Sequence, residues 1–245
     1  MIEDKKQIQW QDIGDILVAT SKQHRFGTDA VLLENFAFSA SARKICDLGS
    51  GCGIIPFLIC KRKKQCEIYA VEIQNEAADL IKASVLKNKL DNIRVICGDA
   101  RDKKLLDSSV GNGFLDLVIC NPPYYKENSG AKCPDKPRSI AREENSFGIY
   151  DAAEAACRLL KYGGRFCVCF KPERLCDCID AMRKNGLEPK RMRMIHTQAE
   201  QKPWLVLVEG KKGAHPFLEV LPPLIVNSEN GQREMNLIYQ SNGCE

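Results

Sequence analysis

The feature that most constrains this sequence is the alternation of short apolar segments with helical patterns between residues 44 and 185. The apolar segments predict strands at residues 44–47, 67–71, 93–97, 115–120 and 165–170. The helical patterns cover residues 75–88, 151–160 and 173–185, and the last of them is closed by Gly186. Strands that alternate with helices form a parallel sheet covered by helices on both faces.

The pattern changes after Gly186. Residues 191–196 and 204–209 predict two strands joined by a polar link that is too short for a crossover helix, so these strands should pair antiparallel at one edge. We therefore predict an α/β, Rossmann-like fold with a seven-stranded, mostly parallel sheet and an antiparallel edge hairpin. The whole chain, residues 1–245, is expected to form a single domain, with residues 1–40 as an N-terminal extension and 41–245 as the core.

Composition narrows the class of protein. No apolar stretch is long enough to cross a bilayer and the N-terminus lacks a secretory signal, so a cytoplasmic protein is expected. The 13 cysteines include no CxxC pair and no set with metal-ligand spacing, which favours free thiols and no metal site. The net charge of +4 is compatible with a nucleic-acid partner but does not require one.

A glycine-rich turn follows the first predicted strand and reads Asp47-Leu48-Gly49-Ser50-Gly51-Cys52-Gly53. Glycines let the backbone approach a ligand closely, and the helix expected after the turn offers free N–H groups. A dinucleotide site would have GxGxxG spacing, and the aspartate here would repel a diphosphate. An aspartate suits the ammonium group of an amino-acid moiety instead.

Acidic residues also end the next two predicted strands. Glu72 is placed to accept hydrogen bonds from ribose hydroxyls, and Asp99, followed by Ala100, is placed to accept from an adenine amine. Together with Asp47 these carboxylates describe a cationic nucleoside without phosphates, which is S-adenosylmethionine. The alternative is that all three are ordinary strand-to-helix turns.

The fourth predicted strand ends in Asn121-Pro122-Pro123-Tyr124. An aromatic amine is a poor nucleophile because its lone pair is delocalised into the ring. The Asn121 side-chain oxygen and the Pro122 carbonyl could accept its two N–H bonds and disperse positive charge as a methyl group arrives. The prolines would stiffen the loop, and Tyr124 could stack on a base swung out of its helix or loop.

The same segment allows another interpretation. Pro122-Pro123-Tyr124-Tyr125 also matches PPxY, the pattern of ligands for WW domains. Such ligands usually lie in exposed segments, whereas this one continues an apolar strand, which favours the methyl-transfer interpretation.

The glycine turn and the Asn121-Pro122-Pro123-Tyr124 motif resemble those of class I methyltransferases that modify amino groups. Four further segments, at residues 26–33, 141–144, 188–193 and 222–224, resemble the bacterial tRNA1(Val) adenine-N6 methyltransferases. That group has Arg-His-Glu where this chain has Arg142-Glu143-Glu144, and Tyr-Phe where it has Tyr124-Tyr125. The resemblance implies N6-methylation of the adenosine 3′ of the anticodon of tRNA(Val).

The resemblance also implies roles for individual segments. Residues 1–40 would act as a lid over the cofactor, and Thr28 would bind its methionine carboxylate, although Thr28 could instead cap a helix starting at Asp29. The residues expected to bind S-adenosylmethionine are Thr28, Asp47, Gly49, Gly51, Gly53, Glu72, Asp99, Ala100 and Asn121.

Basic residues near the acceptor motif and on a later strand are candidates for tRNA contacts through phosphates. They are Lys126, Lys132, Arg138, Arg142, Lys190, Arg191 and Arg193. We expect a monomer or weak dimer. The alternatives are the same chemistry on a protein glutamine amide or an rRNA guanine, or a non-catalytic RNA-binding or WW-binding protein.

Overall fold

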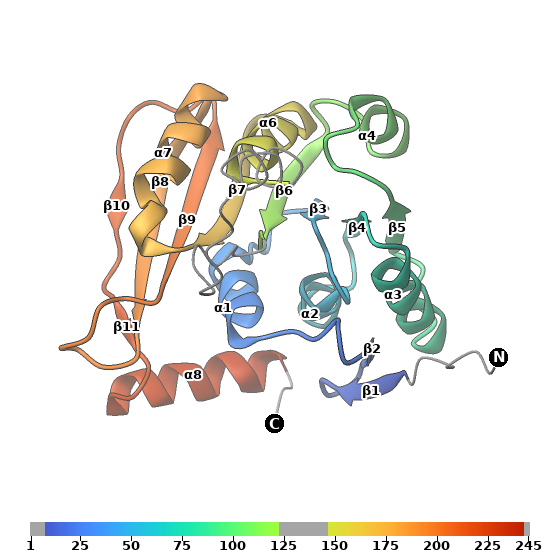
Figure 1. Ribbon diagram of the computed structural model, residues 1–245, viewed down its shortest axis with the longest axis horizontal. Coiled ribbons are helices and arrows are strands. Elements are labelled where there is room, and N and C mark those ends of the chain that lie inside the picture. Colours follow the sequence, from blue (N-terminus) through green and yellow to red (C-terminus); the bar gives the residue numbers. More distant parts are fainter. Residues whose placement is uncertain (1–7, 123–146, 243–245) are drawn as a thin grey trace, which may run out of the picture.

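The computed structural model describes residues 8–122 and 147–242, and its main feature is a nine-stranded sheet (Figure 1). Its seven long strands lie in the order β5-β4-β3-β6-β7-β9-β8. Their bounds are β3 Lys44–Leu48, β4 Glu67–Glu72, β5 Ile93–Cys97, β6 Leu115–Cys120, β7 Leu160–Phe170, β8 Leu187–His196 and β9 Leu205–Lys212. Among these seven only β9 runs antiparallel to its neighbours, β7 and β8. The predicted α/β fold with an antiparallel edge hairpin is confirmed.

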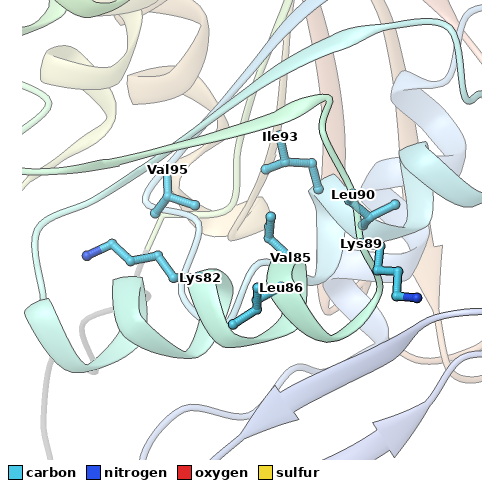
Figure 2. A pocket seen from close by; sticks show the side chains of 7 residues that line it. All are labelled: Lys82, Val85, Leu86, Lys89, Leu90, Ile93 and Val95. Atoms are coloured by element: carbon cyan, nitrogen blue, oxygen red, sulfur yellow. The ribbon is translucent and has the colours of Figure 1, made fainter.

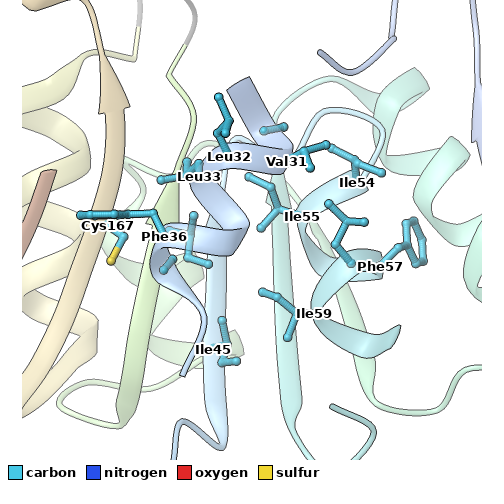
Figure 3. Packing of buried hydrophobic residues seen from close by; sticks show 14 of the residues in the cluster. Val31, Leu32, Leu33, Phe36, Ile45, Ile54, Ile55, Phe57, Ile59 and Cys167 are labelled. Carbon is cyan, nitrogen blue, oxygen red and sulfur yellow. The ribbon is translucent and has the colours of Figure 1, made fainter. Parts of the chain in front are cut away.

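Helices cover both faces of this sheet. They are α1 Thr28–Ala37, α2 Ile54–Arg62, α3 Asn75–Lys87, α4 Lys103–Ser109, α6 Ile149–Leu159, α7 Leu175–Lys184 and α8 Glu229–Asn242, with the short 3-10 helix η1 Pro172–Arg174 before α7. Neighbouring side chains on one strand belong to different clusters. Ile45 packs with α1 and α2 (Figure 3), and Cys46 packs with α6 on the other face. This alternation is the period of a strand buried on both faces.

Two strands begin earlier than predicted. β7 starts at Leu160, because Gly163 and Gly164 lie within the strand and do not end the preceding helix. Gly163 has a φ of 77°. In the pairing of β7 with β6, Leu160 lies opposite Leu115 and Arg165 lies opposite Leu117, so β7 has extra residues between these two pairs. The glycines therefore form a bulge, which a left-handed residue allows. β8 starts at Leu187 and has a similar register shift near Pro189.

Two short strands extend the sheet beyond the predicted seven. β10 (Glu219–Val220) and β11 (Leu224–Ile225) both pair parallel with β8. Each has two residues, which is too short for the alternation that reveals a strand in a sequence.

The N-terminal extension is fastened to α3. β1 (Gln9–Asp12) and β2 (Leu17–Thr20) form a separate hairpin. The Ala19 N–H donates to the Ser84 hydroxyl at 2.8 Å, and the Asn88 amide accepts from and donates to the Leu17 backbone at 2.8 and 2.7 Å. Within the described ranges, no helix is long and apolar enough to span a membrane.

Candidate active site

Three of the predicted site residues, Asp47, Glu72 and Asn121, lie at one edge of the sheet, where the parallel strands end. Leu48 at the end of β3 is paired with Val71 of β4 on one side and with Cys120 of β6 on the other. Glu72 and Asn121 therefore flank the glycine-rich turn that follows β3. Ligands of open α/β sheets bind at this edge.

The three glycines of the turn all adopt left-handed backbone conformations, with φ of 75° at Gly49, 56° at Gly51 and 84° at Gly53. A Cβ added at Gly49 or Gly51 would meet no heavy atom within 4 Å, so these two positions border open space. At Gly53 a Cβ would lie 2.9 Å from the Phe57 ring and 3.0 Å from Ile81. Gly49 and Gly51 thus permit a ligand to approach the backbone, and Gly53 permits α2 and α3 to pack.

Asp47 is a buried carboxylate beneath this turn. Its side chain is 1% exposed, and neither oxygen has a hydrogen-bond partner among the described residues. Burial raises the pKa of Asp47 to about 7, and the nearby negative charge of Glu72 also raises it. The Ser50 hydroxyl donates to the backbone carbonyl of Asp47 at 3.0 Å. An unpaired buried carboxylate is costly, so this position suits a cationic ligand.

Glu72 ties the turn to the end of β4. Its carboxylate accepts from the Gly51 N–H and from the Gln74 N–H, both at 2.8 Å. Each carboxylate oxygen has a second lone pair with which it could accept from a ribose hydroxyl. The predicted contact with the cofactor ribose remains a prediction.

Asp99 has a partner that the sequence did not reveal. Arg101 donates to both of its oxygens from the guanidinium, at distances of 2.7 to 3.1 Å, and from its backbone N–H at 2.8 Å. These hydrogen bonds hold the pKa of Asp99 below its ordinary value. Ala100 beside it is buried in the core. An adenine amine would share Asp99 with this arginine, and its binding there remains a prediction.

Asn121 is held from two sides. Its side-chain Nδ2 donates to Asp29 Oδ2 at 3.0 Å, and its Oδ1 accepts from the Cys169 thiol at 3.0 Å. Asp29 comes from the first turn of α1 and Cys169 from β7. Neither residue is predicted from the sequence to belong to the site, and for Asp29 the sequence offers one signal, its place in the segment 26–33. Pro122 is buried, whereas Pro123, Tyr124, Lys126, Lys132, Arg138 and Arg142 lie outside the described residues.

Thr28 does not cap its helix. α1 begins at Thr28 itself, and its N-cap is Gly27, which has no side chain to contribute. The Thr28 hydroxyl lies 3.2 Å from the hydroxyl of Tyr239 in α8. Its predicted contact with the methionine carboxylate remains a prediction.

The basic residues of β8 make contacts within the protein. Arg191 donates to Glu209 at 2.9 Å and to the Phe36 carbonyl at 2.8 Å. Arg193 binds Glu234 and the Pro222 carbonyl, and Lys190 donates to the His215 carbonyl at 3.1 Å. These contacts hold the side chains in place, and their predicted binding to RNA phosphates remains a prediction.

A surface pocket of about 560 Å³ lies away from this site, between α3 and β5. Figure 2 shows its apolar lining, which includes Val85, Leu90, Ile93 and Val95. Among the described residues its lining includes Lys82 and Lys89 but no acidic side chain and none of the predicted site residues. Among the described residues, no group of three or more His, Cys, Asp and Glu side chains could hold a metal ion.

Comparisons with known proteins agree with this geometry. Residues 21–133 match the model of the family described as "Methyltransferase small domain". The chain is 30% identical to a tRNA1(Val) (adenine(37)-N6)-methyltransferase of Porphyromonas gingivalis, over 76% of this chain and 74% of that one. It is 31% identical to the enzyme of that name from Phocaeicola vulgatus, over 76% of each chain.

Solved structures share the fold. A predicted O-methyltransferase of Agrobacterium tumefaciens superposes with a TM-score of 0.68 at 21% identity, over 87% of this chain and 96% of that one. TYW2 of M. jannaschii, solved in complex with AdoMet, has a TM-score of 0.54 at 17% identity, over 86% of this chain and 88% of that one. These likenesses support the class I fold, and the sequence relatives define the group: this chain belongs to the family of the tRNA1(Val) (adenine(37)-N6)-methyltransferases.

Proposed function

We propose that this protein transfers a methyl group from S-adenosylmethionine to the N6 amine of an adenine in tRNA, at the adenosine 3′ of the anticodon of tRNA(Val). One observation carries the proposal. The buried carboxylate of Asp47 has no hydrogen-bond partner among the described residues, and it lies beneath an open glycine turn beside the strand that leads into Asn121. The names of the curated relatives support the choice of adenine and tRNA.

The residues of the turn fit this cofactor. Asp47 would bind the ammonium group of the cofactor. That group would supply the partner that the buried carboxylate lacks among the described residues. Gly49 and Gly51 leave room for it, and Glu72 keeps the turn in position through the Gly51 N–H. When bound, S-adenosylmethionine supplies an electrophilic methyl group on a sulfonium. Thr28, Gly53, Asp99 and Ala100 complete the proposed set.

Asn121 and Pro122 would act on the adenine amine. The Asn121 Oδ1 and the Pro122 carbonyl accept its two N–H bonds, which draws the nitrogen toward tetrahedral geometry and disperses the charge that develops on it. The thiol of Cys169 is a weak donor, so the amine can replace it at Oδ1. The new bond joins N6 to the methyl carbon, the bond from sulfur to that carbon breaks, and the amine proton leaves to solvent.

Pro123 and Tyr124 would hold the flipped base, residues 1–40 would close over the cofactor, and the basic residues named above would contact tRNA phosphates. All the described cysteines are free thiols, which is consistent with work in the reducing cytoplasm, where tRNA is modified.

The test is methyl transfer from labelled cofactor to unmodified total tRNA, followed by nucleoside analysis, with Asn121→Ala as the control. We expect label in N6-methyladenosine with the wild-type protein and a loss of about 100-fold or more in rate with the variant. Cofactor binding without label in tRNA would contradict the substrate, and parallel reactions with rRNA and with protein would then identify a guanine or glutamine acceptor.

A further inference from the structure

We propose that Asp29 is a positioning residue that sets the orientation of the Asn121 side chain, an inference that rests on the function proposed above. The two residues are 92 positions apart in the sequence, and the Asn121 Nδ2 donates to Asp29 Oδ2 at 3.0 Å. Both side chains are half-buried. Asp29 is the second residue of α1, so a helix on one face of the sheet reaches the end of the central strand β6.

The chemistry of the two partners selects one of the two orientations of the Asn121 amide. A carboxylate only accepts hydrogen bonds, whereas an amide has a nitrogen that donates and an oxygen that accepts. Asp29 therefore requires the amide nitrogen on its side. The Cys169 thiol on the other side donates to Oδ1 at 3.0 Å. A thiol can also accept a weak hydrogen bond, so Cys169 fits this orientation and Asp29 is the partner that selects it. In this orientation the oxygen is the atom that can accept from an amine.

Asp29 also changes the strength of that oxygen as an acceptor. A hydrogen bond from an amide N–H to a charged carboxylate is stronger than one to a neutral group. Such a bond polarises the amide, and its oxygen becomes a better acceptor for the next donor. The methyl acceptor becomes positively charged during the reaction, so the negative charge of Asp29 behind Asn121 favours the development of that positive charge.

Gly27 supplies an independent observation on the same contact. A Cβ placed at Gly27 would lie 2.7 Å from Asp29 Oδ1, closer than van der Waals contact allows. The backbone of Gly27 is extended, with φ of −119° and ψ of 176°, a conformation that alanine adopts without strain. Gly27→Ala is therefore expected to move the Asp29 carboxylate while the helix and its backbone stay intact.

The first test compares kinetics of Asp29→Ala, Asp29→Asn and Gly27→Ala with those of the wild type. We expect kcat to fall about 10- to 100-fold in Asp29→Ala, because a misplaced catalytic group costs rate more than binding. Asp29→Asn retains an oxygen for the Asn121 Nδ2 and should lose less, and Gly27→Ala should lie between them. The Kd for S-adenosylmethionine and the KM for tRNA should change less than about threefold. The matched control is Asp79→Asn. Asp79 is an exposed carboxylate on α3, and in the described contacts it pairs only with Lys82.

The second test does not depend on activity. The side-chain amide of Asn121 is assigned in a 15N–1H NMR spectrum from its loss in Asn121→Ala. Its resonances should move in Asp29→Ala and Gly27→Ala and stay in place in Asp79→Asn. Unmoved resonances, or an Asp29→Ala enzyme with wild-type kcat, would overturn the inference. If the wild type does not methylate tRNA, the proposed function fails, and the spectrum still decides whether Asp29 orients Asn121.

Discussion

At the scale of the residue, Asp47 is a buried carboxylate that lowers the stability of the folded protein at neutral pH. Its carboxylate is buried without a hydrogen-bond partner among the described residues, and its pKa is raised to about 7. A raised pKa means that the fold favours the protonated form. The stability that this preference contributes is fully present below pH 3.8, the pKa of the carboxyl in the unfolded chain. It is lost as the pH rises through about 7, the pKa in the folded protein.

Asp47→Asn is expected to stabilise the protein without cofactor. Asn has a similar shape and no charge, so the gain over the wild type should grow by about 2 kcal/mol between pH 5 and pH 8, at roughly 1.4 kcal/mol per pKa unit. Urea unfolding at the two pH values measures this, and calorimetry should show that cofactor binding is lost. Two unfolding curves that differ equally at both pH values would contradict the raised pKa.

The glycines of the turn are expected to respond differently to alanine. Gly51→Ala puts an alanine into a left-handed backbone conformation, with its Cβ in open space, and should cost about 1 kcal/mol of stability. The added methyl group should also reduce cofactor affinity by about tenfold or more. Gly53→Ala adds a contact at 2.9 Å with Phe57 and should cost about 2–4 kcal/mol. Unfolding and binding titrations on both variants check this, and equal losses of stability would contradict the distinction.

At the scale of the element, Glu209 of β9 joins the edge hairpin to the rest of the sheet. It accepts from Arg165 of β7 at 2.8 Å and from Arg191 of β8 at 2.9 Å, on the two strands that flank its own. Its side chain is 10% exposed, and those of the arginines are 21% and 30% exposed. Arg191 also donates to the carbonyl of Phe36, at the end of α1. The group therefore fixes the antiparallel strand against a helix.

Glu209→Ala should lower the free energy of unfolding by about 2 kcal/mol, because it leaves two partly buried guanidiniums without their shared partner. The arginines are partly exposed, so the loss should be smaller than for a fully buried pair. Asp79→Ala, which breaks an exposed ion pair with Lys82, should cost less than about 0.5 kcal/mol. Urea unfolding of the two variants measures the difference, and similar losses would show that Glu209 has no special role.

At the scale of the whole molecule, the C-terminal helix α8 closes one face of the fold. It packs against α1 and α2, and Figure 1 shows it running beneath α1. Met235 and Ile238 are buried at 6% and 4% exposure, and Tyr239 meets Thr28 at the start of α1. The helix that carries Asp29 is therefore supported by the last element of the chain.

Two neighbouring positions of α8 test this support. Ile238→Ala should destabilise the protein by about 2–4 kcal/mol, because it opens a cavity in a packed core. Leu237→Ala removes a side chain that is 65% exposed and should change stability by less than about 0.5 kcal/mol. Denaturant unfolding compares the two, and an equally mild effect at Ile238 would show that α8 is only loosely attached.

The sequence by itself determined the class of fold and the sheet edge at which the proposed site residues Asp47, Glu72 and Asn121 lie. The alternation of apolar segments and helical patterns predicted five of the long strands, and the two apolar segments joined by a short link after Gly186 predicted the edge hairpin, because the period of burial is a local property that each segment carries. Asp47, Glu72 and Asn121 each lie at the carboxyl end of a predicted parallel strand, which predicted that they lie at one edge, because parallel strands place their carboxyl ends together. Strand boundaries at Gly163 and near Pro189 were less well predicted, since a bulge breaks the local period.

Only the tertiary structure decided which side chains hold these groups. Asp29 meets Asn121 because α1 crosses the end of β6, Arg191 turns inward because Glu209 lies on the strand beside it, and Ile238 is buried because α8 returns to α1. The pairing of Asp99 with Arg101 is local, but a sequence does not show that the arginine bends back. Contacts of this kind depend on how elements pack and not on the residues next to them in the chain, so no local pattern announces them.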